Sequence, residues 1–101
     1  MRNNRVVKFV EVVQNNSSTG SSYHLQEVFI NPNHIVYIRN ASWLKAQLNE
    51  GNLPGGLDGR QSFSTIHLSR GSTGIDINVV GEPSAVREKI GIPSQQELLQ
   101  G

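Results

Sequence analysis

Three histidines, His24, His34 and His67, are the side chains best suited to metal coordination or proton transfer. Histidine is the commonest metal ligand and titrates near neutral pH. No two of the three lie at the short spacing that local metal-ligand motifs require. The chain also has no cysteine, which removes thiol catalysis, disulfides and cysteine-based zinc sites. We therefore predict no metal centre and expect the histidines at strand surfaces or edges.

Nucleophilic and acid–base chemistry find no local support in the sequence. No serine lies in a Gly-x-Ser-x-Gly elbow. The only aspartates are Asp58, in a glycine-rich stretch, and Asp76, in a predicted strand. An acid–base pair needs two carboxyl groups a few ångström apart with separated pKa values, and nothing in this spacing indicates one. We predict that the protein is not an enzyme and needs no cofactor.

The glycine-rich run 51–60 is the one candidate anion-binding loop. Backbone amides and the Arg60 guanidinium are groups that can cradle a phosphate. The run lacks the Gly-Lys-Ser/Thr ending of a phosphate loop, and Pro54 interrupts it. The pattern therefore favours a flexible loop over a nucleotide site.

A mixture of aromatic and basic residues is a candidate nucleic-acid surface. Small β domains bind single strands by stacking bases on aromatic rings and pairing phosphates with cations. The residues that fit are Tyr37, Arg39, Lys45 and Arg60, with Trp43 as a second stacking platform. The formal net charge is only +1 and no basic run is present, so this interpretation is an alternative and not the main one.

Trp43, Leu44 and Leu48 are the candidate partner-binding residues. They belong to residues 41–49, where the spacing predicts two turns of amphipathic helix. An aromatic and leucine cluster is a common anchor for a protein partner. The same segment can instead fold back as a lid over the sheet, and both interpretations stay open.

Five segments rich in β-branched or alternating apolar residues predict strands, at residues 6–13, 23–30, 34–39, 63–68 and 75–79. The polar stretch 15–22 predicts a turn or loop that joins the first two into a long hairpin. Pro83 and Gly91 predict the first turn and the end of a C-terminal helix over 83–90. We predict a mainly β, α+β fold: a five-stranded antiparallel sheet or partly open small barrel, with that short helix.

Two strands carry informative patterns of faces. In 75–79, Ile75, Ile77 and Val79 alternate with polar residues, so we expect these three side chains to point inward. The strand 6–13 has apolar residues on both faces. Such a strand is either covered on both sides or lies against a partner chain.

The 101 residues are the size of one domain, 1–101, and we expect 40–62 to be a mobile insertion within it. The apolar run 6–13 is too short and too charged for a signal peptide or a membrane span. With no cysteine, the chain fits a reducing cytoplasm. Only 17% of residues are charged, which favours self-association, and we expect it through the first strand.

The order of motifs resembles the FlbD-like family, small proteins associated with bacterial flagella and swarming. The resemblance lies in Asn31-Pro32-Asn33-His34-Ile35-Val36-Tyr37-Ile38, in Thr65-Ile66-His67-Leu68-Ser69-Arg70-Gly71 and in the run 79–90, and it covers about residues 23–39 and 63–90. It implies a small β fold with a closing helix and brings no catalytic residues. The insertion 40–62 and the first loop are additions to that pattern, which leaves a phage or mobile-element protein as an alternative origin.

Together these patterns predict a small non-enzymatic adaptor or regulatory protein that acts through protein contacts, in motility or in a phage. A nucleic-acid-binding regulator is the first alternative. A structural component of a phage or cell-surface assembly is another, and an enzyme with a site assembled between subunits is a third.

Overall fold

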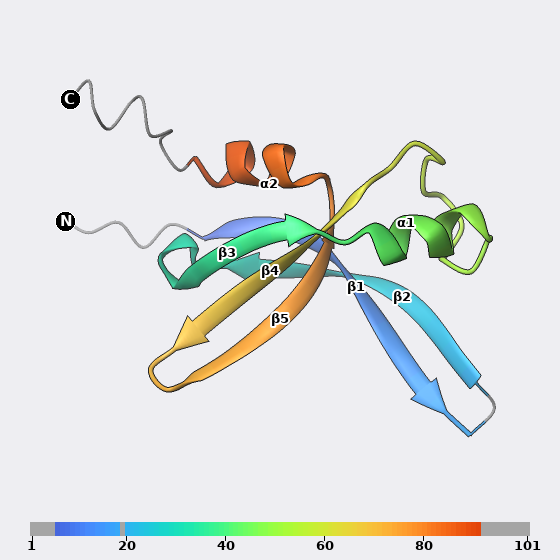
Figure 1. Cartoon of the computed structure of the whole chain (residues 1–101), viewed down its shortest axis with the longest axis horizontal. Coiled ribbons are helices and arrows are strands. Elements are labelled where there is room, and N and C mark those ends of the chain that lie inside the picture. The colour runs from blue at the N-terminus through green and yellow to red at the C-terminus, as the bar shows by residue number, and fades with distance from the viewer. Residues whose placement is uncertain (1–5, 19, 92–101) are drawn as a thin grey trace.

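The structure, a computed structural model, describes residues 6–18 and 20–91. Five strands, one 3₁₀ turn and two α-helices follow one another along the chain (Figure 1). They are β1 (Val7–Ser17), β2 (Gly20–Ile30), η1 (Pro32–His34), β3 (Ile35–Asn40), α1 (Ser42–Asn49), β4 (Phe63–Arg70), β5 (Thr73–Val80) and α2 (Pro83–Ile90). The predicted five strands and C-terminal helix are confirmed.

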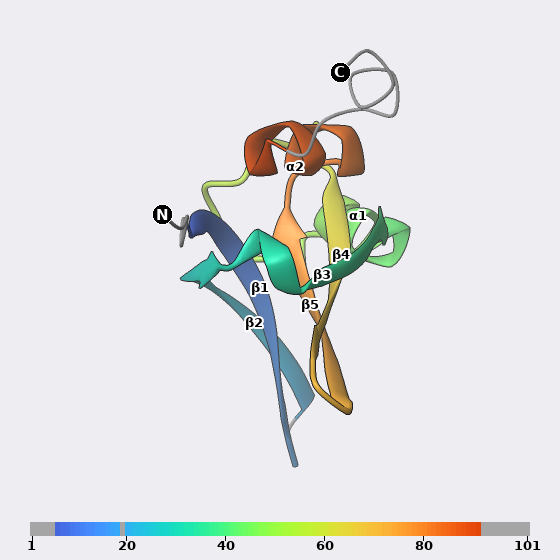
Figure 2. The ribbon, with the colours of Figure 1, turned by 90° about the vertical axis from the view of Figure 1, so that its left-hand side faces the viewer.

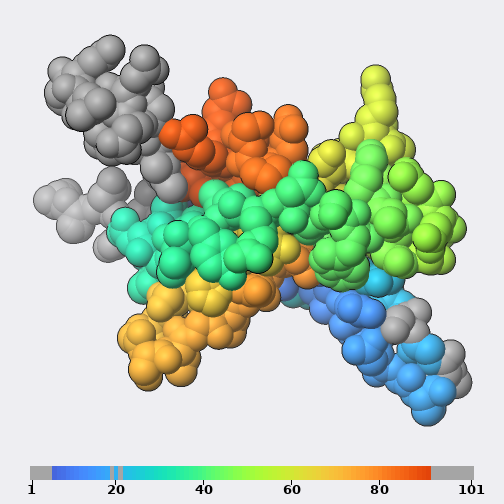
Figure 3. Space-filling model, in the orientation of Figure 1, coloured from blue at the N-terminus to red at the C-terminus, as the bar shows by residue number. Residues whose placement is uncertain are grey.

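The strands form one antiparallel sheet in the order β2-β1-β5-β4-β3. The sheet is open and does not close into a barrel, which decides between the two predicted forms. Its two edge strands, β2 and β3, are neighbours in the chain and are joined by η1. The hairpins β1–β2 and β4–β5 project from the body as two separate arms (Figures 1 and 3).

The first hairpin is longer than the sequence predicted. Its ladder runs without a shift from the pair Val7–Ile30 to the pair Ser17–Gly20, so most of the expected loop 15–22 is strand. Gly20, the first residue of β2, has φ +128°, a backbone conformation that favours glycine. Polar strand ends have the same composition as loops, and composition therefore could not separate them.

Apolar side chains are buried on both faces of the sheet. The first core lies under α2 and contains Val7, Phe9, Ile30, Ile66, Ile77, Val79, Val86 and Ile90. The second core lies under α1 and contains Val12, Ala41, Leu44, Leu53 and Phe63. Successive side chains of a strand point to opposite faces, so β1 supplies Phe9 to one core and Val12 to the other. Of the two arrangements that the sequence left open for the first strand, the structure shows apolar cores on both of its faces.

Helix α2 covers the end of the sheet opposite the turns of the two hairpins (Figure 2). Pro83 stands in its first turn, and Gly91 ends it in the left-handed conformation with φ +79°. The Gly91 backbone N–H donates to the carbonyl oxygens of Arg87 and Glu88. Val86 and Ile90 are its buried side chains, so the helix attaches to the first core by one short apolar stripe.

The insert 40–62, predicted to be mobile, is attached to the other face at several points. Leu44 and Leu53 are buried in the second core. The Lys45 ammonium donates to the backbone oxygens of Gly59, at 2.9 Å, and Gln61, at 2.8 Å. The Ala41 backbone N–H donates to the carbonyl oxygen of Phe63 at 2.9 Å. These contacts place the insert as a cover over the second core.

Candidate functional site

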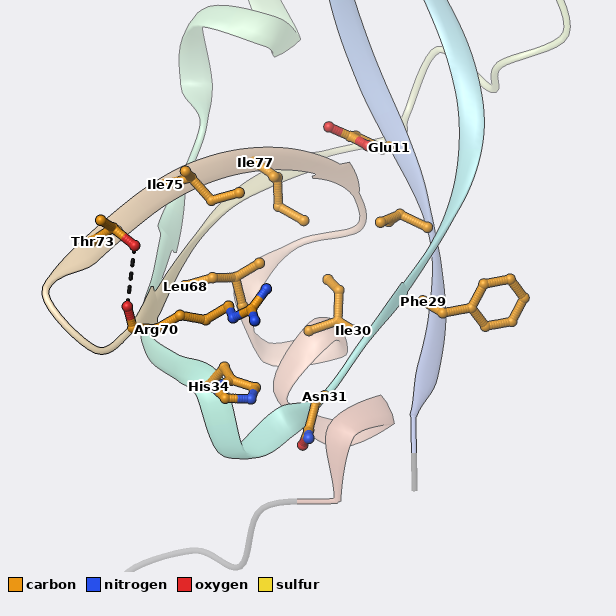
Figure 4. A pocket seen from close by; sticks show the side chains of 12 residues that line it. Glu11, Phe29, Ile30, Asn31, His34, Leu68, Arg70, Thr73, Ile75 and Ile77 are labelled. Atoms are coloured by element: carbon orange, nitrogen blue, oxygen red, sulfur yellow. Dashed lines mark hydrogen bonds between the residues drawn. The ribbon is translucent and has the colours of Figure 1, made fainter. Parts of the chain in front are cut away.

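An open cleft of about 500 Å³ lies between the two hairpins, on the face of the sheet that carries α2. Its floor is apolar: the side chains of Ile30, Leu68, Ile75 and Ile77 point into it (Figure 4). The Phe29 ring points away from it. This volume falls in the range of ligand pockets, about 300–1,000 Å³, which are typically apolar with a few polar groups.

The floor is open because α2 lies across one end of the strands and does not extend over the hairpin turns (Figure 2). Ile77, beneath the helix, is buried, but Ile75 is 60% exposed. The expectation that Ile75 points inward is therefore corrected: it shares the face of Ile77 and Val79 but lies beyond the helix.

Three ionisable side chains, Glu11, His34 and Arg70, stand around this floor. The Glu11 carboxylate accepts a hydrogen bond from the Gln26 amide at 3.1 Å, and His34 Nδ1 lies 3.2 Å from the Ser69 carbonyl oxygen. The Arg70 side chain extends into the cleft (Figure 4) and forms no ion pair within the described ranges. An apolar floor beside an unpaired guanidinium suits a ligand that combines an apolar group with a carboxylate.

The structure separates the three candidate partner-binding residues. Leu44 is completely buried in the second core, which corrects its assignment to a binding surface. Leu48 is partly buried against that core. Trp43 is 44% exposed, and its ring centroid lies 6.4 Å from that of Tyr23 in β2. Of the set, Trp43 has the most accessible surface.

Each of the four candidate nucleic-acid contacts interacts with residues of its own chain. Tyr37 and Arg39 lie together, with the guanidinium carbon 4.4 Å from the Tyr37 ring centroid. Tyr37 also stacks on His67, with centroids 4.8 Å apart and ring planes 7° from parallel. The ring that was to stack on a base is therefore already in contact with two side chains of its own chain.

The other two cations of that set have partners within the insert. Lys45 binds the backbone oxygens of Gly59 and Gln61, as described above. The Arg60 guanidinium pairs with the Asp58 carboxylate at 3.1 Å. Side-chain and backbone hydrogen bonds from Arg60 lower the pKa of Asp58 from its usual 3.8. The glycine-rich run is thus organised by its own contacts.

The three histidines lie in three different places. His24 contacts the Asn15 amide at 2.7 Å, His34 contacts Ser69, and His67 Nδ1 contacts the Asp76 carboxylate at 2.5 Å. No group of three or more histidine, aspartate or glutamate side chains suited to a metal ion occurs within residues 6–18 and 20–91. Asp58 and Asp76 each have a different basic partner.

The cleft was not identified from the sequence. Ile75 carried the only local signal, an apolar residue next to the turn of a hairpin, and alternation assigned it to the core.

Comparison of the chain with protein-family models, with curated proteins and with solved structures finds no match. No helix in the described part of the chain is long and apolar enough to cross a membrane.

Proposed function

We propose that this protein is a small non-enzymatic adaptor or regulator of the cytoplasm that binds a segment of a partner protein in the cleft between its hairpins. The observation that carries the proposal is the exposed apolar floor of that cleft, above all Ile75, which is 60% exposed. Exposed apolar surface in a concave site is typical of binding sites.

Arg70 defines the kind of segment that fits. Its guanidinium lies at the floor without an ion-pair partner among the described residues. A charge-assisted hydrogen bond to a carboxylate is about twice as strong as a neutral one. The expected ligand is therefore a short peptide with an aliphatic or aromatic side chain next to an acidic residue.

The test is a selection of short random peptides on the full chain, followed by binding measurements with variants. Ile75→Glu and Arg70→Glu should each weaken the selected peptides by at least about tenfold, as expected for central interface residues. Val36→Glu is the matched control, because Val36 is 58% exposed and does not line the cleft. Peptides that bind Ile75→Glu as well as the unchanged chain would contradict the proposal.

Nucleic-acid binding remains an alternative proposal, supported by the adjacent Tyr37 and Arg39. It predicts that a fluorescent single-stranded oligonucleotide binds the chain, that added salt weakens the complex, and that Arg39→Glu abolishes it. Binding that survives Arg39→Glu would count against this surface.

The biological setting is still a prediction. The FlbD-like resemblance, with its motility association, and the phage alternative both lead to an adaptor or to a structural component of an assembly. Either role is compatible with a cleft that binds a protein segment and with the self-association argued below.

A further inference from the structure

Among the described residues, the outermost strands of the sheet are β2 and β3. β1 pairs with β2 along its whole length, but its ladder with β5 has the single pair Glu11–Val79. Self-association through the first strand, as the sequence suggested, therefore stays a prediction. The long free edge is β2, whose eleven residues pair with β1 on one side only.

The β2 edge has few of the features that prevent strand addition. Natural edges are protected by lysine, proline, bulges or short length. β2 contains no lysine or proline, and its ladder with β1 has no register shift. Its one acidic residue, Glu27, pairs with the Lys8 ammonium at 3.3 Å. The edge strand β3, by contrast, has six residues and a register shift between Ile35 and Tyr37.

We propose that β2 pairs antiparallel with β2 of a second copy of this chain, with the two-fold axis at Leu25. Leu25 is the midpoint of Gly20–Ile30, so this register pairs the whole strand. A two-fold axis makes the contact self-complementary and closed. An axis at Gln26 would leave Gly20 and Ser21 without partners in β2 of the other copy, because the strand ends at Ile30.

Charge and apolar contacts favour the same register. An axis at Glu27 would bring two glutamates face to face, which destabilises a strand pair. At Leu25, each Glu27 faces Tyr23 of the other copy, and Leu25 faces Leu25. Phe29, which is 61% exposed, then becomes a diagonal neighbour of Tyr23 in the other copy. Within each copy, the Tyr23 ring is in contact with the Trp43 ring. This register thus places exposed aromatic side chains of the two copies next to one another on one face of the extended sheet.

The absence of cysteine makes the register directly testable by disulfide trapping. With the axis at Leu25, the two copies of Leu25→Cys have Cα atoms about 4.5–5.5 Å apart, within disulfide range. His24→Cys and Gln26→Cys should not crosslink alone but should crosslink when mixed, because they oppose each other. Val36→Cys, on β3, is the collision control: it should still form the dimer but should not crosslink.

Sedimentation equilibrium of the unchanged chain should give twice the monomer mass of 11.1 kDa at high concentration. Phe29→Lys should weaken the dimer by at least about tenfold, whereas Val36→Lys should not change it. Ile75→Glu should also leave the mass unchanged, which separates this proposal from the proposed peptide site. A chain that stays at 11.1 kDa, or a Val36→Cys crosslink as rapid as that of Leu25→Cys, would overturn it.

Discussion

At the residue scale, polar side chains on the face of β3, β4 and β5 opposite the cleft interact with one another. Tyr37 stacks on His67, and His67 contacts the Asp76 carboxylate. Beside them, the Thr65 hydroxyl donates to the Asn78 side-chain oxygen at 2.7 Å. Cross-strand pairs of this kind stabilise a sheet by up to about 1 kcal/mol each. We therefore assign this row to strand pairing.

Gly74 provides the space for the His67 ring, which makes the row testable. A Cβ at position 74 would lie 2.9 Å from His67 Nε2, too close for the ring to stay in place. Gly74→Ala should therefore lower the free energy of unfolding by about 1 kcal/mol, at the lower end of over-packing costs. Urea unfolding measures this loss.

The matched control is Gly59→Ala, because a Cβ there meets nothing within 4 Å and the backbone φ is not positive. In a His67→Ala background, the cost of Gly74→Ala should fall, since the two residues are in contact and only the approach to the Leu68 carbonyl oxygen, at 3.3 Å, then remains. An equal loss in both backgrounds would show that the His67 ring is not the cause.

At the element scale, the insert 40–62 depends on one polar latch in addition to its apolar contacts. The Lys45 ammonium binds two backbone oxygens across the insert, from Gly59 and Gln61. A hydrogen bond to a charged group contributes about 1.5–3 kcal/mol. The latch therefore controls local opening of the insert more than unfolding of the sheet.

Lys45→Met keeps the aliphatic stem and removes both hydrogen bonds. We expect limited proteolysis within residues 50–62 to become about tenfold faster, because cleavage follows the population of the open form. Lys8→Met is the control, since Lys8 pairs with Glu27 on the surface of the first hairpin. Equal cleavage rates for the two variants would contradict a latch at Lys45.

At the scale of the whole molecule, one sheet separates two apolar cores, each under one eight-residue helix. The hairpins extend beyond α2 as arms (Figures 2 and 3). The cleft lies between these arms, whereas β2 is an edge strand because of the strand order.

The two-core arrangement predicts unequal losses of stability for neighbouring residues of α1. Leu44→Ala should lower the free energy of unfolding by about 2–5 kcal/mol, because it leaves a cavity in the second core. Trp43→Ala should cost less than half as much, since Trp43 is 44% exposed. Urea denaturation followed by circular dichroism compares the two, and a larger loss for Trp43→Ala would contradict this placement.

Local chemistry was sufficient to predict the elements. Pro83 and Gly91 define the C-terminal helix because the preferences of helix ends act within one turn. Alternating apolar residues predict the strands because successive side chains point to opposite faces. The extension of β1 and β2 through 15–22 was missed because the pairing of polar strand ends depends on the opposite strand.

Local patterns thus predicted five antiparallel strands and the closing helix, and they left two arrangements open for the first strand. Which apolar side chains stay exposed became clear only from the folded chain. Ile75 and Ile77 share one face, and Trp43 and Leu44 share one helix, yet one of each pair is buried and the other is not. Burial depends on where a helix from elsewhere in the chain ends and docks, and residue spacing within one segment does not contain that information.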